Sequence, residues 1–132
     1  ENQNKKILTL EKPIEYKHTS KKSVIVQKEV GIGGDVSDFR DGVKNSLRED
    51  CDIVVIGEIR DKETAEIAIQ AGQTGHYVLS TIHTIDSVEV ITRLRKMGIS
   101  NYDIASTVAT AVSQRLVRRV CKNCCRHFCF FV

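Results

Sequence analysis

The sequence predicts an α/β protein built on a mainly parallel β-sheet. Short aliphatic runs of strand length alternate along the chain with segments of helical periodicity, and residues 53–56 are four aliphatic residues in a row. Alternation of this kind is typical of βαβ units. An unbroken aliphatic run is typical of a parallel strand that is buried on both faces. We therefore expect residues 53–56 to form a central, fully buried strand.

Length and charge limit the class of protein only weakly. The 132 residues suffice for one domain with a real core, and 20 basic against 17 acidic residues give a net charge of +3. This balance neither requires nor excludes nucleic acid or an acidic membrane surface as a partner. No apolar run approaches the roughly 18 residues of a membrane-spanning helix, and the first residues do not resemble a signal peptide. We expect a cytoplasmic protein.

Three further strands are expected, at residues 7–11, 24–30 and 76–81, and we expect the last to be buried. Pro13 removes a backbone donor and favours extended geometry at Lys12, so the first strand should end near Glu11. The glycine-rich residues 31–35 predict only a turn, because no Gly-Lys-Ser/Thr follows them.

Four helices are expected between and after these strands. Ser37 is the expected N-cap of the first, and Asp86 with Glu89 predicts a capping box for the third, which should stop at Gly98. The fourth should begin at Asn101 and extend to Val112, ahead of a cationic strand or turn at residues 114–120. The expected inward positions are Phe39, Val43 and Leu47; Ala65, Ala68, Ile69 and Gly72; Val90, Leu94 and Met97; and Ile104, Ala105, Val108, Ala109 and Val112.

Polar residues follow three of the expected strands. They are Glu11 and Glu15; Glu58 and Arg60; and Thr81, His83 and Thr84. Strand carboxyl ends meet in one crevice of an open α/β sheet, where ligands bind. Carboxylates, an arginine and a histidine there suit phosphate-ester chemistry with a metal ion. Each residue alone has a simpler interpretation: Glu58 as a surface residue at a loop, and His76 as a hydrogen-bond partner of a loop carbonyl.

Four stretches, residues 11–16, 47–61, 74–84 and 114–121, together resemble the signature of the type II secretion and type IV pilus ATPases. The resemblance covers about residues 7–124, with the motifs in order. It implies part of a RecA-like P-loop NTPase core over residues 1–120, followed by a truncated cysteine-rich tail at residues 121–132.

The resemblance also implies residue roles. Gly57 and Glu58 match an atypical Walker B motif with Glu58 as the catalytic carboxylate, and Thr81 lies in the strand-end cluster beside it. Glu11 and Glu15 match an acidic box that helps to hold Mg²⁺ and water. His76 and His83 match a histidine box, with His83 the stronger candidate for sensing the γ-phosphate of ATP. Arg48 and Arg60 match arginines that neutralise charge or contact a neighbouring subunit.

For the whole protein, the resemblance implies ATP hydrolysis by a hexameric ring on the cytoplasmic face of the inner membrane. Subunit motion would drive pilin or pseudopilin assembly through a membrane platform protein, with no direct contact to nucleic acid. Three departures bear on this: Lys12 replaces a usual Asp, Cys51 replaces a usual Pro, and no Gly-x-x-x-x-Gly-Lys-Ser/Thr loop occurs in the 132 residues. The family places that loop upstream, so we expect a fragment that is inactive alone.

Five cysteines indicate a metal or redox cluster rather than a disulfide framework, since four of them lie between residues 121 and 129. Cys121 and Cys124 are candidate ligands for half of a zinc knuckle, and four ligands are needed to close such a site. Cys51 should be a small core residue.

Two other functions stay open. A non-catalytic remnant of the fold would serve only oligomerisation or partner binding, as Lys12 and the missing loop favour. A DNA-uptake motor would account for the arginines at 115, 118 and 119, which a solvated or intersubunit face accounts for equally well.

Overall fold

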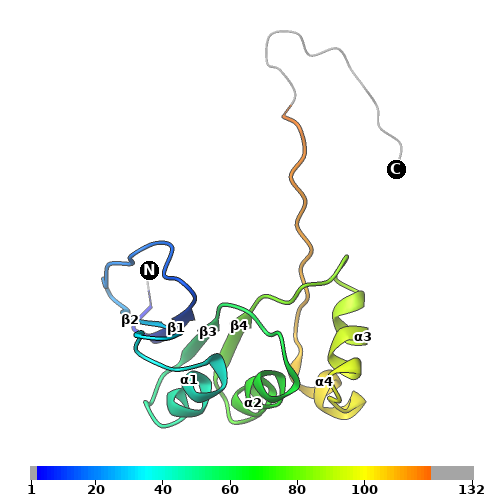
Figure 1. Ribbon diagram of the computed structural model, residues 1–132, viewed down its shortest axis with the longest axis horizontal. Helices are drawn as coiled ribbons and strands as arrows, with labels where there is room; N and C mark the ends of the chain where they lie inside the picture. The colour runs from blue at the N-terminus through cyan, green and yellow to red at the C-terminus, as the bar shows by residue number, and fades with distance from the viewer. Residues whose placement is uncertain (1–2, 120–132) are drawn as a thin grey trace.

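The computed structural model describes residues 3–119 and contains a four-stranded parallel sheet in this part of the chain (Figure 1). Its strands are β1 (Lys6–Glu11), β2 (Val24–Glu29), β3 (Ile53–Ile56) and β4 (Tyr77–Ser80). They lie in the order β2-β1-β3-β4, and each neighbouring pair is parallel. The predicted α/β class with a parallel sheet is confirmed, and β3 is an inner strand as expected.

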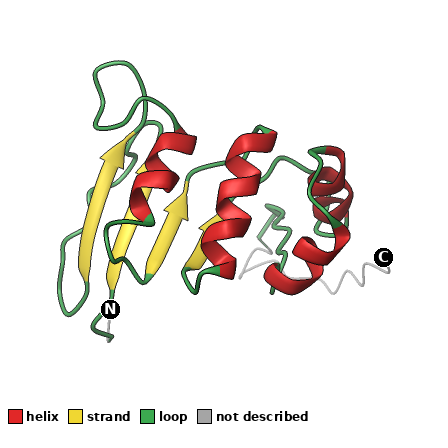
Figure 2. Cartoon of the chain, turned by 90° about the horizontal axis from the view of Figure 1, so that it is seen from below, coloured by secondary structure: helices red, strands yellow, loops and turns green. Residues whose placement is uncertain are grey.

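Four helices accompany the sheet in the described residues: α1 (Phe39–Ser46), α2 (Lys62–Gln73), α3 (Glu89–Lys96) and α4 (Asn101–Thr107). The first two lie side by side across one face of the sheet, and α3 and α4 pack beyond α2 (Figures 1 and 2). No helix in this part of the chain combines the length and the hydropathy needed to cross a bilayer.

The core lies between the sheet and the α1–α2 layer. Leu10, Val54 and Ile56 are fully buried there, whereas Ile53 and Val55 are only half-buried. The expectation that residues 53–56 are buried on both faces is therefore wrong for the described chain: its helices cover one face, so burial alternates along β3.

The strand β4 also differs from the prediction. It pairs with β3 alone among the described strands, and its Tyr77 and Leu79 side chains are 62% and 46% exposed. The aliphatic run predicted the strand correctly, but three of the four residues of β4 are exposed and only Val78 is half-buried.

Two helix starts show what local sequence signals capture. Asp38, not Ser37, is the N-cap of α1, since its carboxylate accepts a hydrogen bond from the backbone N–H of Asp41 at 2.8 Å. The Ser37 hydroxyl instead donates to the Asp41 carboxylate. Asp86 accepts from the N–H of Glu89, and the Glu89 carboxylate accepts from the N–H of Ile85. These bonds lie just ahead of α3, however: its N-cap is Val88, without a side-chain cap, so the predicted capping box is wrong in position.

The last helix is shorter than expected. It ends at Thr107 because Val108 takes an extended conformation, and Val112 is 83% exposed rather than inward. Residues 108–119 have no regular secondary structure. Valines and threonines are weak helix formers. Val108 still packs against the core, but residues 109–119 are exposed, so no packed surface compensates for them there. Ala105 and Ala109, also expected to face inward, are exposed. The core position of Cys51 is confirmed, and Gly98 takes the left-handed conformation (φ +92°) that ends α3.

We predict that Val54→Ala destabilises the protein much more than Val55→Ala. The Val54 side chain is fully buried against the helices, so its truncation should cost about 2–3 kcal/mol through lost burial and a residual cavity. The half-buried Val55 should lose less than half of that. Urea unfolding with an unchanged m-value measures both, and equal losses would show that the second face is also covered in solution.

Candidate active site at the carboxyl ends of the strands

Backbone pairing continues past the ends of the inner strands and brings three predicted segments to one edge of the sheet. The N–H of Gly57 donates to the carbonyl of Leu10 at 2.8 Å, and the N–H of Ile59 donates to the carbonyl of Thr81 at 2.9 Å. These bonds place the residues after β1, β3 and β4 side by side. The convergence expected for a parallel sheet is therefore present.

Glu58 is the centre of this edge. Its Oε2 lies 2.6 Å from Nε of Arg60 and 3.2 Å from Nε2 of His83. The Glu58 side chain is 15% exposed, whereas those of Arg60 and His83 are 71% and 78% exposed. A carboxylate only accepts hydrogen bonds, so Nε2 of His83 carries the proton in this contact. A largely buried carboxylate thus meets two solvent-facing partners.

Charge at this edge favours the ionised form of Glu58. The hydrogen bond from Arg60 is the largest influence and lowers the pKa of the Glu58 carboxyl; burial opposes it, and the contact with His83 adds to the lowering. Glu58 is therefore held as a carboxylate, the form that accepts a proton from water.

Gly57 and Thr81 fix the turn that carries Glu58. The Thr81 hydroxyl donates to the carbonyl of Gly57 at 2.6 Å. A Cβ at Gly57 would lie 3.1 Å from the carbonyl oxygen of Leu10 and 3.4 Å from the Phe39 ring, so a larger residue would force its neighbours to shift slightly.

Glu11 lies at the same edge in a different environment. Its Oε1 accepts from the Thr9 hydroxyl at 2.6 Å and from Nε2 of Gln27 at 2.9 Å. Burial raises the pKa of the Glu11 carboxyl, but the hydrogen bonds from Thr9 and Gln27, together with the charge of His18 and the backbone N–H of Glu15, bring it below its ordinary value. Glu15 is exposed on the loop that follows.

Two residues assigned to the site by the resemblance lie elsewhere. Arg48 follows α1 and precedes β3, and His76 directly precedes β4, so both lie toward the amino ends of the strands. Nδ1 of His76 is 3.2 Å from the carbonyl of Ala71 and 3.3 Å from the Thr74 hydroxyl. This is the simpler role that the sequence left open for His76.

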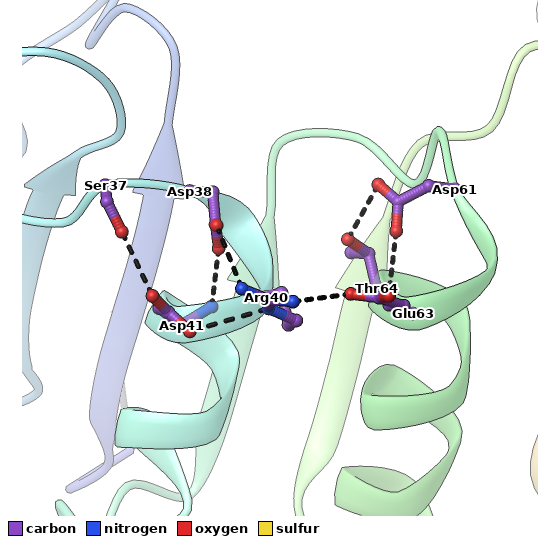
Figure 3. A network of polar contacts seen from close by, with 7 residues as sticks. All are labelled: Ser37, Asp38, Arg40, Asp41, Asp61, Glu63 and Thr64. Carbon is purple, nitrogen blue, oxygen red and sulfur yellow. Dashed lines mark hydrogen bonds and ion pairs between the residues drawn. The ribbon is translucent and has the colours of Figure 1, made fainter.

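Beside the strand ends, a polar network joins the first turns of α1 and α2 (Figure 3). Arg40 of α1 pairs with Glu63 of α2 at 2.6 Å, and Asp61 caps α2 through the N–H and hydroxyl of Thr64. A cavity of about 230 Å³ adjoins the network. Its lining is Lys12, Val30, Ser37, Asp38, Phe39, Arg40, Asp61, Glu63 and Thr64. The Asp-x-x-Thr pattern of the cap can be recognised in the sequence. The Arg40–Glu63 pair cannot, because it joins two helices that are separate in sequence.

The donor set of the edge suits Mg²⁺ of the kind that keeps several waters and takes one or two carboxylates beside substrate phosphates. Glu58 and Glu11 supply such carboxylates at neighbouring strand ends. Among the described residues, no group of three or more His, Cys, Asp or Glu side chains forms a closed metal site. Cys121 and Cys124, the candidate zinc ligands, lie outside the described residues.

We predict that Arg60→Met raises the pKa of Glu58 more than His83→Ala does, because the Arg60 hydrogen bond is the stronger influence. A ¹³C titration of the Glu58 carboxyl should give a midpoint below 4.5 in the unmodified chain. Since the folded-state pKa is lowered, these contacts stabilise the fold above the unfolded-state pKa. Their contribution is lost as pH falls through the folded-state pKa. A larger rise for His83→Ala would contradict this order.

Comparison with known proteins identifies the family. A family described as "Type II/IV secretion system protein" matches residues 1–130. The chain is 46% identical over 120 residues to the type IV pilus assembly ATPase PilB of Acinetobacter baylyi, covering 91% of this chain and 20% of that protein. It is 48% identical over 118 residues to a putative type II secretion system protein E of Escherichia coli, covering 89% of this chain and 23% of that protein.

Solved structures agree with these matches. The pilus retraction motor PilT with bound ADP superposes with a TM-score of 0.71 at 39% identity, over 79% of this chain and 30% of that one. The Legionella pneumophila ATPase DotB gives 0.68 at 35% identity, over 80% of this chain and 29% of that one. This chain spans only about a fifth to a quarter of the curated relatives named above. It belongs to the type II/IV secretion system protein family.

Proposed function

We propose that this chain is the hydrolytic part of a motor ATPase that powers type IV pilus assembly or type II protein secretion. The relatives named for those activities share 46% and 48% identity with it. The observation that carries the proposal is Glu58, a largely buried carboxylate at a strand end, held by Arg60 and His83. A carboxylate so placed suits the orientation of a water for attack on a phosphate.

In this proposal each residue has a defined task. Glu58 accepts a hydrogen bond from the attacking water and takes its proton. Arg60 and His83 lie at the same carboxylate oxygen and face solvent, so an incoming γ-phosphate would draw their hydrogen bonds toward itself. Glu11 and Glu15 present further oxygens at the neighbouring strand end. When bound, Mg²⁺ supplies charge neutralisation for the phosphates.

The remaining proposals concern the assembly. We propose a homohexamer at the cytoplasmic face of the inner membrane that acts on a membrane platform protein. Arg48 is exposed toward the opposite edge of the sheet from Glu58 and is therefore available to a neighbouring subunit. His76 is committed to its loop contacts. We propose no direct role for nucleic acid.

A non-catalytic remnant is the alternative with its own support, because Lys12 adds a positive charge beside Glu11 and the 132 residues contain no phosphate-binding loop. The two functions differ in whether Glu58 turns over nucleotide, and the next experiment decides between them.

In a protein that joins this chain to its upstream phosphate loop, Glu58→Gln should lower the kcat for ATP hydrolysis by a factor of about 10²–10⁴, because it removes the proton acceptor. The matched control is Glu66→Gln, at an exposed residue of α2 that pairs with Lys62. Its kcat should be unchanged. Equal activity in the two variants, measured by phosphate release, would favour the non-catalytic alternative.

The 132-residue chain alone should bind Mg-ATP weakly or not at all. In P-loop enzymes the backbone amides and lysine of the missing loop hold the phosphates, and the carboxylates of this chain repel them. Isothermal titration calorimetry measures this directly. Tight, saturable binding would show that these residues hold nucleotide without the loop.

A further inference from the structure

Gln27 lies on β2 directly opposite Thr9 of β1 in the parallel register. Its side-chain amide makes three hydrogen bonds. Nε2 donates to Oε1 of Glu11 at 2.9 Å and to the carbonyl of Tyr16 at 2.8 Å, and Oε1 accepts from the N–H of His18 at 2.7 Å. One side chain therefore joins a strand-end carboxylate to the loop that follows it.

The three partners fix the orientation of the amide. Glu11 as a carboxylate and the Tyr16 carbonyl only accept hydrogen bonds, while the His18 N–H only donates. Rotating the amide by 180° would break all three contacts. The amide therefore has a single favourable orientation. Through it, the position of the carboxylate is linked to the position of the loop.

The loop itself has few apolar contacts to hold it. Residues 12–23 connect two parallel strands without a helix, and most of their side chains are exposed, Tyr16 by 78%. Polar contacts help to attach it. They include the two from Gln27, the Ser20 hydroxyl that accepts from the N–H of Ile25, and the Ser23 hydroxyl that accepts from the N–H of Lys5. Gln27 differs from Ser20 in that its side chain also contacts Glu11.

The two side-chain hydrogen bonds on Glu11 end on the same oxygen, and the backbone N–H of Glu15 also donates to this carboxyl. Thr9 and Gln27 both donate to Oε1, so neither engages Oε2. A carboxylate whose one oxygen is held by two donors presents the other in a defined direction, and hydrogen-bonding partners of this kind orient carboxylates that face a metal or its waters.

We propose that Gln27 is a positioning residue for Glu11, holding the carboxylate and the loop at residues 12–23 in one arrangement, from which Glu11 would help to hold Mg²⁺ and its water when nucleotide binds. This rests on the proposed function, because Glu11 has that task only in a nucleotide-hydrolysing protein. Gln27 acts through Glu11 and does not itself touch the reacting atoms.

Two substitutions at Gln27 separate its two contacts. Gln27→Met is close in size and removes all three hydrogen bonds. Gln27→Glu keeps an acceptor for the His18 N–H, removes the donor to the Tyr16 carbonyl and places a like charge against Glu11. Ser20→Ala is the matched control, since it removes a loop contact without touching Glu11. Amide hydrogen exchange at His18 should therefore quicken in Gln27→Met and stay slow in Gln27→Glu.

The contact with Glu11 is tested without any activity by a double-mutant cycle in urea unfolding. The effects of Gln27→Met and Glu11→Met should be non-additive, and those of Ser20→Ala and Glu11→Met additive, because Met at either position removes the hydrogen bond. Additive effects in the first cycle would overturn the proposal. This result does not depend on nucleotide, so it stands even where ATP hydrolysis is absent and the proposed function fails.

The functional readout uses the protein with its phosphate loop. Both Gln27 variants should raise the Mg²⁺ concentration for half-maximal ATP hydrolysis about ten- to hundredfold, the usual effect of removing a residue that orients a ligand. Ser20→Ala should leave it unchanged. If the Gln27 variants show the same Mg²⁺ dependence as Ser20→Ala, Gln27 only fastens the loop and the proposal is wrong.

Discussion

The parallel pairing of β3 between β1 and β4 is the constraint on which the rest of the structure depends. It sets Ile56 beside Leu10 and Ser80, so the inner strands end at the same level. The backbone bonds from Gly57 to Leu10 and from Ile59 to Thr81 extend that alignment beyond the strands. A slip of one residue would turn Val54 and Ile56 away from the helices. Burial of the core and placement of Glu58 therefore require the same register.

The helical layer follows from this sheet. Leu10 is fully buried beneath α1, and a Cβ at Gly42 would lie 2.8 Å from one of its methyl groups, so the glycine sets how closely α1 approaches. In α2 the buried side chains are Thr64 and the alanines at 65, 68 and 71. Small residues bring both helices close to the strands, and their first turns then meet at the Arg40–Glu63 pair. This polar contact between the two helices thus supports the strand ends that carry Glu58.

Local signals accounted for the strands, the order of the helices and the convergence of Glu58, Arg60 and His83, since each depends on residues near in sequence and on a general property of parallel sheets. The predictions that were wrong concern features that depend on contacts between residues distant in sequence. Burial of Tyr77 depends on which elements cover β4, and the end of α4 depends on whether Val112 meets a packed surface. The role of Gln27 could not be predicted from sequence, because its contacts exist only once β1 and β2 are paired. His76 was ambiguous from sequence, and its contacts with Ala71 and Thr74 come from the turn it ends.

The two carboxylates of the edge are held by opposite means. The partners of Glu58 are ionic or ionisable and solvent-facing, so salt and competing anions weaken their hold. Glu11 is held mainly by the neutral Thr9 and Gln27, whose hydrogen bonds are insensitive to screening, and the charge of His18 acts on it to a smaller extent. A phosphate at this edge would compete with Glu58 for Arg60 and His83. It would not compete in the same way for Thr9 and Gln27, because these two donors to Glu11 are neutral. The contacts of Glu58 can therefore change when a ligand binds, whereas those of Glu11 should stay the same.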